Sequence, residues 1–164
     1  MDFAAAYEAY FARIYSYIRC RAGGAAAAED LAAEVFRKAL ENFAQYDPAR
    51  GNLAQWLFGI ARNEVNYYFR RAALLRFLPL DLFGDTLAKE RAPEAPGGGA
   101  DGLAAALRRL DERERDLIGL KFYSELNNRE IAKVTGLSES NVGTVLYRCM
   151  AKLRKELAGE EYEK

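Results

Sequence analysis

The segment that decides the fold runs from Asn127 to Leu157 and reads NNREIAKVTGLSESNVGTVLYRCMAKLRKEL. Gly136 lies near its middle, with Ala132 four residues before it and Val142 six residues after it. This spacing is typical of a helix-turn-helix. The small Ala132 lets two helices approach, Gly136 permits the tight turn between them, and Val142 fills the angle that they form.

The second helix of this motif has two faces of different character, and Ser138 is suited to cap its N-terminus. One face is apolar and predicts a buried stripe of Val142, Val145, Leu146, Cys149 and Leu153. The other face is polar and basic and carries Ser140, Thr144, Tyr147, Arg148, Ala151 and Lys155. Such a face near a helix N-terminus fits the major groove of DNA, where Arg148 can reach a guanine edge or a phosphate. The alternative is an ordinary solvated face on a small helical bundle.

The charge of the chain is balanced overall and basic locally. Lys and Arg number 24, as do Asp and Glu. Between Arg129 and Lys155, however, six basic residues stand against two acidic ones, Glu130 and Glu139. A local basic surface on a neutral protein is compatible with DNA binding that a larger partner assists.

Working back toward the N-terminus, apolar residues recur at helical spacing in three stretches. They predict helices over residues 3–21, from about 26 to 43, and over 53–75. Gly23 and Gly24 end the first helix, and the turn-rich segment 46–52, with Pro48 and Gly51, follows the second. The second helix also has a stripe of charged residues, Asp30, Glu34, Arg37 and Glu41, which by itself predicts a solvated surface.

The third predicted helix also has two faces. Its apolar stripe, expected in the core, consists of Leu57, Phe58, Ala61, Val65, Tyr68 and Phe69. The opposite face carries aromatic, amide and guanidinium groups, namely Trp56, Asn63, Tyr67, Arg70 and Arg71. These groups suit single-stranded DNA, because rings stack on bases, amides bond base edges and guanidinium groups hold phosphates. The alternative is that Trp56 and Tyr67 pack against the first helix or the linker.

The predicted fold class is all-α, with two small helical domains joined by a flexible linker. Residues 1–76 form the first domain, an N-terminal helical bundle. Residues 77–102, with three prolines and the run Gly97-Gly98-Gly99, form the linker, and residues 103–159 form the domain with the helix-turn-helix. Residues 160–164 are expected to be a frayed tail.

Several classes of function are excluded by composition. The chain contains no histidine, which rules out His-ligated zinc and His-based acid–base chemistry. No phosphate-cradling glycine loop is present either, so we expect no enzyme activity, no cofactor and no metal. Cys149 is expected in the core and Cys20 nearer the surface. The N-terminus is not a signal peptide and no apolar run is long enough to span a membrane, so the protein is expected in the cytoplasm.

Three segments together resemble a known family. AEDLAAEVFRKAL (28–40), RGNLAQWLFGIARNEVNYYFRR (50–71) and the segment from Leu110 to Leu157 are similar, in order, to the polymerase-binding, minus-ten-reading and minus-thirty-five-reading segments of extracytoplasmic-function (ECF) sigma factors. The order of the three segments around a tether rich in proline and glycine makes the resemblance specific.

The resemblance implies partners and site residues. Core RNA polymerase would bind Asp30, Glu34, Arg37 and Glu41. Melted, single-stranded minus-ten DNA would be read by Arg50, Asn52, Trp56, Asn63, Tyr67, Tyr68, Arg70 and Arg71. Duplex minus-thirty-five DNA would be read by Ser140, Asn141, Thr144, Tyr147, Arg148 and Lys152. The linker would thread toward the polymerase active-site cleft, and an anti-sigma factor is an expected further partner.

The chain departs from the family pattern at a few positions. Ala33 stands where the family often has Gln, and Tyr67 where it often has Asp or Asn. Gly143 and Val145 stand where Lys or Arg is frequent, so we expect fewer phosphate contacts and a shallower salt dependence of DNA binding. Two other functions stay open at this point. One is a stand-alone helix-turn-helix regulator, and the other is a degenerate relative that only occupies polymerase or an inhibitor.

Overall fold

The computed structural model describes residues 2–76 and 101–160, and within these residues every regular element is a helix. The predicted all-α class is therefore confirmed. Nearly all of the predicted linker, residues 77–100, and most of the predicted tail, residues 161–164, lie outside the described residues.

The N-terminal half consists of α1 (Phe3–Ala22), α2 (Ala25–Asn42), a short 3-10 helix η1 (Phe43–Gln45) and α3 (Leu53–Arg76). Each helix begins and ends within two residues of the sequence prediction, except that α2 gives way to η1 at Phe43. Asp2 caps α1 by accepting a hydrogen bond from the Ala5 backbone N–H at 2.8 Å. Gly23, with a φ of 83°, ends that helix in a conformation that side-chain-bearing residues rarely adopt.

The core of this half lies between α1, α2 and α3. Leu57, Phe58, Ala61 and Val65 on α3 are buried as predicted, and the ring of Tyr17 meets Phe58 edge to face at 5.6 Å. Burying a side chain such as Phe58 stabilises the fold by about 1.5–3 kcal/mol. The prediction for Cys20 was wrong, because only 6% of this residue is exposed. Its place near the end of α1 brings it beneath α5 of the other half.

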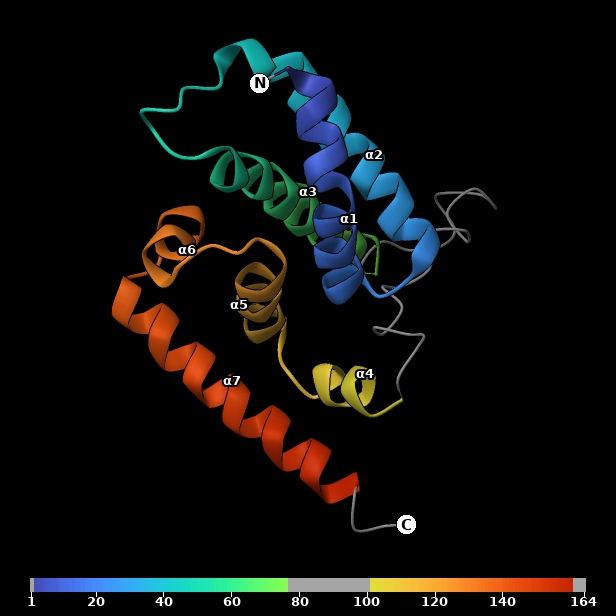
Figure 1. The fold of residues 1–164 in the computed structure, drawn as a ribbon. Helices are drawn as coiled ribbons and strands as arrows, with labels where there is room; N and C mark the ends of the chain where they lie inside the picture. The colour runs from blue at the N-terminus through green and yellow to red at the C-terminus, as the bar shows by residue number, and fades with distance from the viewer. Residues whose placement is uncertain (1, 77–100, 161–164) are drawn as a thin grey trace.

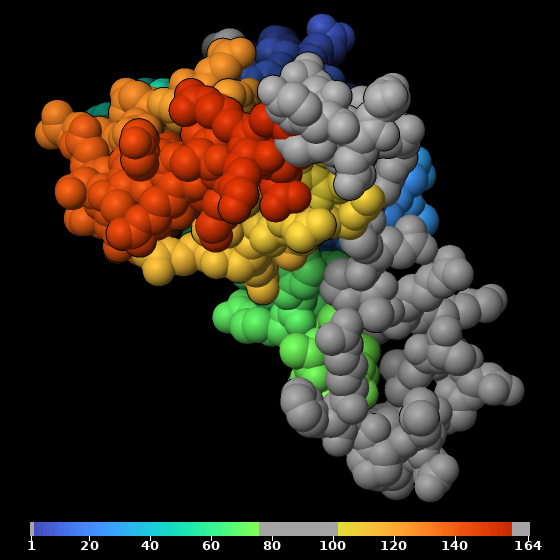
Figure 2. All heavy atoms as spheres, turned by 90° about the horizontal axis from the view of Figure 1, so that it is seen from below, coloured from blue at the N-terminus to red at the C-terminus, as the bar shows by residue number. Residues whose placement is uncertain are grey.

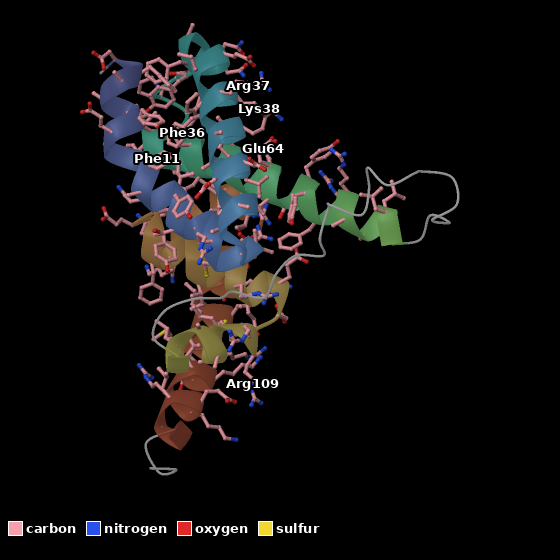
Figure 3. All side chains as sticks on the ribbon, turned by 90° about the vertical axis from the view of Figure 1, so that its right-hand side faces the viewer. Phe11, Phe36, Arg37, Lys38, Glu64 and Arg109 are labelled. Atoms are coloured by element: carbon pink, nitrogen blue, oxygen red, sulfur yellow. The ribbon has the colours of Figure 1, made fainter. Side chains whose placement is uncertain are left out.

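The outer side of α1 is more exposed than its apolar spacing predicts. Tyr7 and Phe11 remain more than a third exposed, and both rings meet Phe36 of α2, at 4.7 and 5.8 Å between ring centres. Figure 3 shows Phe11 and Phe36 side by side between the two helices. These rings form the edge of the core, because the side chains of Tyr7 and Phe11 stay partly open to solvent.

The C-terminal half consists of α4 (Asp101–Arg108), α5 (Glu112–Tyr123), α6 (Asn128–Thr135) and α7 (Glu139–Glu160). Helices α6 and α7 form the predicted helix-turn-helix. Gly136 adopts the left-handed conformation with a φ of 75°, and Val142 is fully buried. The Asn141 backbone N–H donates to the Ser138 hydroxyl at 3.2 Å, which confirms Ser138 as the cap of α7.

The two halves pack against each other, which the sequence alone left undecided. Helix α1 lies on α5, and α3 lies on α6 (Figure 1). Their buried apolar side chains form one continuous cluster. The helices that carry the predicted minus-ten and minus-thirty-five residues are thereby brought into one body.

Candidate nucleic-acid interface

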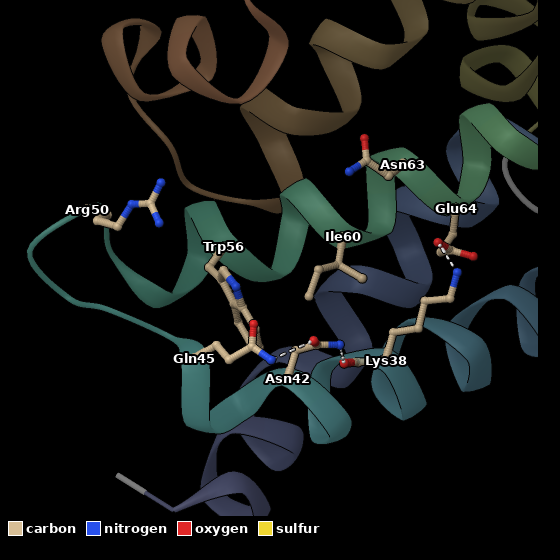
Figure 4. A pocket seen from close by; sticks show the side chains of 8 residues that line it. All are labelled: Lys38, Asn42, Gln45, Arg50, Trp56, Ile60, Asn63 and Glu64. Carbon is tan, nitrogen blue, oxygen red and sulfur yellow. Dashed lines mark hydrogen bonds and ion pairs between the residues drawn. The ribbon is translucent and has the colours of Figure 1, made fainter.

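A hollow opens between α2, α3 and the loop that joins them (Figure 4). Its volume is about 370 Å³. Eight residues line it, namely Lys38, Asn42, Gln45, Arg50, Trp56, Ile60, Asn63 and Glu64. Three of these, Arg50, Trp56 and Asn63, were predicted from the sequence as minus-ten residues, and the fold brings them together at one place.

Trp56 forms an aromatic wall of the hollow. Its ring lies 5.5 Å from the ring of Tyr46 and 6.2 Å from that of Phe43, measured between centres. These two rings come from the segment that follows α2, and nearly all of the linker that the alternative named lies outside the described residues. Trp56 stays half-buried, so part of its side chain remains accessible.

The floor of the hollow is polar and internally paired. Lys38 Nζ lies 2.8 Å from Glu64 Oε1, and this hydrogen bond raises the pKa of Lys38. Asn42 donates to the Lys38 backbone carbonyl at 2.8 Å, and Gln45 donates to the Asn42 side-chain oxygen at 3.3 Å. Both kinds of hydrogen-bonding group, donors and acceptors, therefore line one small space.

The sequence interpretation missed the residues that α2, η1 and α3 add to this hollow, namely Lys38, Asn42, Gln45, Ile60 and Glu64. A pattern that could have found the first three was present. Lys38, Asn42 and Gln45 are spaced i, i+4, i+7, which places them on one face of a helix. Helical spacing does not predict the path of the loop from Tyr46 to Asn52, which folds back over that face and borders the hollow.

The remaining predicted minus-ten residues lie at the two ends of α3. Asn52 caps its N-terminus by accepting from the Gln55 N–H at 2.9 Å, and its side chain also donates to Glu130 of α6 at 2.7 Å. Toward the other end Tyr67 is 56% exposed, whereas Tyr68 is half-buried against Phe69 at 5.6 Å. Arg70 and Arg71 are exposed on the last turns of the helix.

The predicted polymerase-binding stripe on α2 is paired within itself. Arg37 lies between two carboxylates, with its Nη2 2.6 Å from Glu34 Oε1 and its Nη1 2.5 Å from Glu41 Oε1. The hydrogen bond from Arg37 lowers the pKa of Glu34, and its two partners raise the pKa of Arg37. Asp30 is exposed on the same helix. A partner that binds this stripe would compete with these ion pairs, which are exposed and therefore weak.

The predicted minus-thirty-five residues line an open face of α7. Ser140, Asn141, Thr144, Tyr147, Arg148 and Lys152 are all exposed, and Tyr147 is 76% exposed. Figure 2 shows α7, orange to red, lying open on the surface beside α4. Lys152 pairs with Glu114 of α5, and Asn141 accepts a hydrogen bond from Arg113 at 3.3 Å. Gly143 does not belong to this face, because its missing side chain would point toward Asn128 of α6.

Known proteins share both halves of this chain. Residues 6–74 match the family model described as Sigma-70 region 2, and residues 106–155 match Sigma-70, region 4. The ECF RNA polymerase sigma factor BldN of Streptomyces coelicolor is 31% identical over 92% of this chain, which spans 58% of the length of BldN. The ECF sigma factor SigM of Bacillus subtilis is 26% identical, over 90% of each chain.

Solved structures share this fold. The sigma factor RpoE in complex with the anti-sigma factor NepR from Bartonella quintana covers 96% of this chain and 97% of its own, with a TM-score of 0.78 and 20% identity. CnrH in complex with the cytosolic domain of CnrY covers 96% of this chain and 88% of its own, with a TM-score of 0.67 and 26% identity. Among the described helices, none combines the length and the apolar character that a membrane span requires.

Proposed function

The chain belongs to the sigma-70 family of RNA polymerase sigma factors, in its ECF branch, and we propose a role for each of its binding faces. Members of this family are transcription initiation factors, and this chain is a promoter-directing sigma factor. A stand-alone regulator is not favoured, because both sigma regions are present in order. Residues 1–76 would be the region-2-like domain, 77–102 the linker and 103–159 the region-4-like domain.

The hollow beside Trp56 is the observation that carries the proposal for the minus-ten element. We propose that it takes one base flipped out of the melted strand. A base of about ten heavy atoms, each needing no more than the roughly 30 Å³ share of a liquid water, requires at most about 300 Å³. The hollow offers about 370 Å³. Stacking on an aromatic ring such as Trp56 stabilises a bound base by about 1–3 kcal/mol.

The polar floor would then decide which base is accepted. Asn63 and Gln45 present amide groups to the hollow, and amides can donate to one base edge and accept from another. Arg50 at the rim is exposed and can reach a backbone phosphate. Asn52, Tyr67, Tyr68, Arg70 and Arg71 lie outside the hollow, where they would hold the strand on either side of the flipped base.

The exposed face of α7 would read the minus-thirty-five duplex. Arg148 is suited to a guanine edge, and Ser140, Asn141, Thr144, Tyr147 and Lys152 to bases or phosphates. Each contact face is small, so neither alone is expected to bind tightly. Polymerase would supply the missing affinity, because two weak modules held on one body bind with a high effective concentration.

The α2 stripe of Asp30, Glu34, Arg37 and Glu41 would dock on core polymerase. We expect an anti-sigma factor as a further partner, because RpoE of Bartonella quintana, which has the same fold, is held in a complex with one. The protein would act in the cytoplasm, where polymerase is, and as a specificity subunit rather than as an enzyme.

The test is run-off transcription from a fragmented genomic library, with core RNA polymerase in the presence and absence of this chain. Defined transcripts that appear only with the chain support the proposal, and their upstream sequences reveal both elements. Asn63→Ala should then lower the yield about 5- to 150-fold, since one lost base contact costs about 1–3 kcal/mol. The control Arg154→Ala changes an exposed residue of α7 beyond the reading face and should leave the yield unchanged. If the chain does not bind core polymerase, the proposal is wrong.

A further inference from the structure

The loop between α2 and α3, from Tyr46 to Asn52, is tied down at both of its ends. The Tyr46 hydroxyl donates to the backbone carbonyl of Gly51 at 3.2 Å, which joins the first residue of the loop to its last but one. Asn52 and Gln55 bond each other reciprocally. The Asn52 backbone N–H donates to Gln55 Oε1, and the Gln55 backbone N–H donates to Asn52 Oδ1, both at 2.9 Å. The far end of the loop is therefore fixed to the first turn of α3.

The middle of the loop is held by Asp47. Its carboxylate accepts a hydrogen bond from the Ala49 backbone N–H at 2.9 Å, and its backbone carbonyl accepts one from the Arg50 N–H at 3.0 Å. An aspartate that bonds the backbone two residues further on imitates a turn and holds it. Arg50, which the proposed function places at a phosphate, thus leaves the chain from a defined turn, at the same end of the hollow as Trp56 (Figure 4).

The same loop supports the aromatic wall of the hollow. The Tyr46 ring lies 5.5 Å from the ring of Trp56, and the Phe43 ring lies 6.4 Å from Tyr46 and 6.2 Å from Trp56, measured between centres. Phe43 is held in turn by Phe3 in the first turn of α1, edge to face at 5.4 Å. Two rings from outside α3 therefore limit how far Trp56 can turn.

A hollow that had to order itself around a base would bind that base poorly. Fixing the backbone of one residue lowers a binding constant about 5- to 30-fold, whereas stacking one base on an aromatic ring raises it about 5- to 150-fold. Ordering two or three residues of this seven-residue loop would therefore cancel the whole gain from Trp56. The site gains affinity from the base only if the loop is ordered beforehand.

We propose that the loop from Tyr46 to Asn52 is already built before DNA arrives, and that Tyr46 and Asp47 are positioning residues for the base site. This inference rests on the proposed function, since the base site is the hollow assigned to minus-ten DNA. Tyr46 acts through its ring on Trp56 and through its hydroxyl on Gly51. Asp47 acts through the turn that presents Arg50. Neither positioning residue lines the hollow itself.

Four variants separate these contributions. Tyr46→Phe keeps the ring and removes the hydroxyl, whereas Tyr46→Leu removes both. Asp47→Ala removes the side-chain acceptor of the turn, and Asp47→Asn restores an oxygen at the same place. Matched controls lie on α1, away from the hollow. Tyr7→Phe removes the hydroxyl of an exposed tyrosine that bonds none of the described residues through it, and Glu8→Ala removes an exposed acid.

The first measurement needs no DNA, because Trp56 is the single tryptophan of the chain and its fluorescence reports on the hollow directly. It is the decay of fluorescence anisotropy in the free full chain, with circular dichroism to verify that helix content is unchanged. A loosely held side chain reorients within nanoseconds. Such a fast component should appear in Tyr46→Leu and be absent from the wild type and both controls. A wild type that shows it overturns the proposal, as does a Tyr46→Leu variant that lacks it.

The second measurement is binding to a single strand by the chain in complex with core RNA polymerase. The probe is a labelled oligonucleotide with the minus-ten sequence found by run-off transcription, in which an abasic site replaces each base in turn. One abasic position should weaken binding by the wild type about 5- to 150-fold and so identify the flipped base. The intact oligonucleotide should bind Tyr46→Phe about 2- to 12-fold more weakly, the factor that one hydrogen bond contributes.

The penalty of the abasic site separates positioning from general stability. In Tyr46→Leu that penalty should be smaller than in the wild type, because the ring on which the base stacks is no longer held. A merely structural defect would instead weaken the intact and the abasic strand equally. For Asp47→Ala, the slope of log affinity against log salt concentration should become shallower by about 0.7, the value of one phosphate contact to a single strand, and Asp47→Asn should restore it.

The outcomes also distinguish this inference from the function on which it rests. If no abasic position weakens binding by the wild type, the hollow is not a base site and both proposals for it fail, while anisotropy decay still decides whether the loop is preformed. If one position does and Tyr46→Leu keeps the full penalty, only the positioning role of Tyr46 is wrong. An unchanged salt slope in Asp47→Ala, or no recovery in Asp47→Asn, overturns the role of Asp47.

Discussion

Gly143 lies inside α7, one residue after the buried Val142, where a glycine is expected to weaken the helix. In a helix interior glycine costs about 0.5–1 kcal/mol relative to alanine, because its backbone loses more freedom on folding. The structure shows room for the added methyl group, since a Cβ atom there would meet Asn128 Nδ2 at 3.5 Å, an ordinary van der Waals contact. Gly143→Ala should therefore raise the free energy of unfolding by about 0.5–1 kcal/mol.

The assay is urea unfolding followed by circular dichroism, with melting temperature as a second measure. For a protein of this length the variant should melt about 1–4 °C higher. Gly59→Ala, also inside a helix and without neighbours near the added Cβ, should give a gain of the same sign. Gly136→Ala should give the opposite sign, a loss of about 1–2 kcal/mol, because the φ of 75° is costly for any residue with a side chain.

Affinity for minus-thirty-five duplex provides a second readout of the same variant. Because position 143 points toward α6 and not along the exposed face, Gly143→Ala should bind duplex within about twofold of the wild type, a difference well below that of a lost base contact. The reasoning is refuted if Gly143→Ala destabilises the protein while Gly59→Ala stabilises it. That outcome would mean that α6 and α7 approach more closely than the structure shows.

Three further predictions concern individual side chains. Arg148→Ala should weaken binding to minus-thirty-five duplex, measured by fluorescence anisotropy at several salt concentrations. If Arg148 contacts a phosphate, the slope of log affinity against log salt concentration should also become shallower by about one. Lys38→Met should lower the free energy of unfolding by about 1–3 kcal/mol, because the Glu64 carboxylate would lose its partner. The side chain of Glu64 is only 11% exposed, so water replaces that partner poorly. An unchanged free energy in urea unfolding would count against this ion pair. Burial raises the pKa of Cys20 and of Cys149 from 9.0 to about 11, so the unfolded chain loses these protons at lower pH than the folded one. Stability should therefore fall as pH rises from about 9 to 11, by on the order of 2 kcal/mol per thiol, and Cys20→Ala should show a shallower fall.

Local rules were sufficient for the helices and for the helix-turn-helix. The 3.6-residue spacing of apolar side chains placed α1, α2 and α3 within about two residues, because each helix must turn one stripe toward a core. The helix-turn-helix depends on three residues that lie within a few positions of each other, namely Gly136, Ser138 and Val142. Their spacing alone was therefore enough to predict the turn, the cap of α7 and the buried side chain between the two helices. Composition likewise excludes histidine chemistry by itself, because the chain contains no imidazole group at all.

Only the tertiary structure decided how these elements meet. The hollow joins Lys38 and Asn42 of α2 with Trp56 and Asn63 of α3 through a loop whose path no periodicity describes. Asp116 belongs to no motif of the sequence, and only the structure shows that its carboxylate accepts hydrogen bonds from three donors of the other half of the chain. The physical reason is that a helical pattern specifies which side of an element is apolar, whereas partners separated by about a hundred residues are selected by shape and charge when the chain closes.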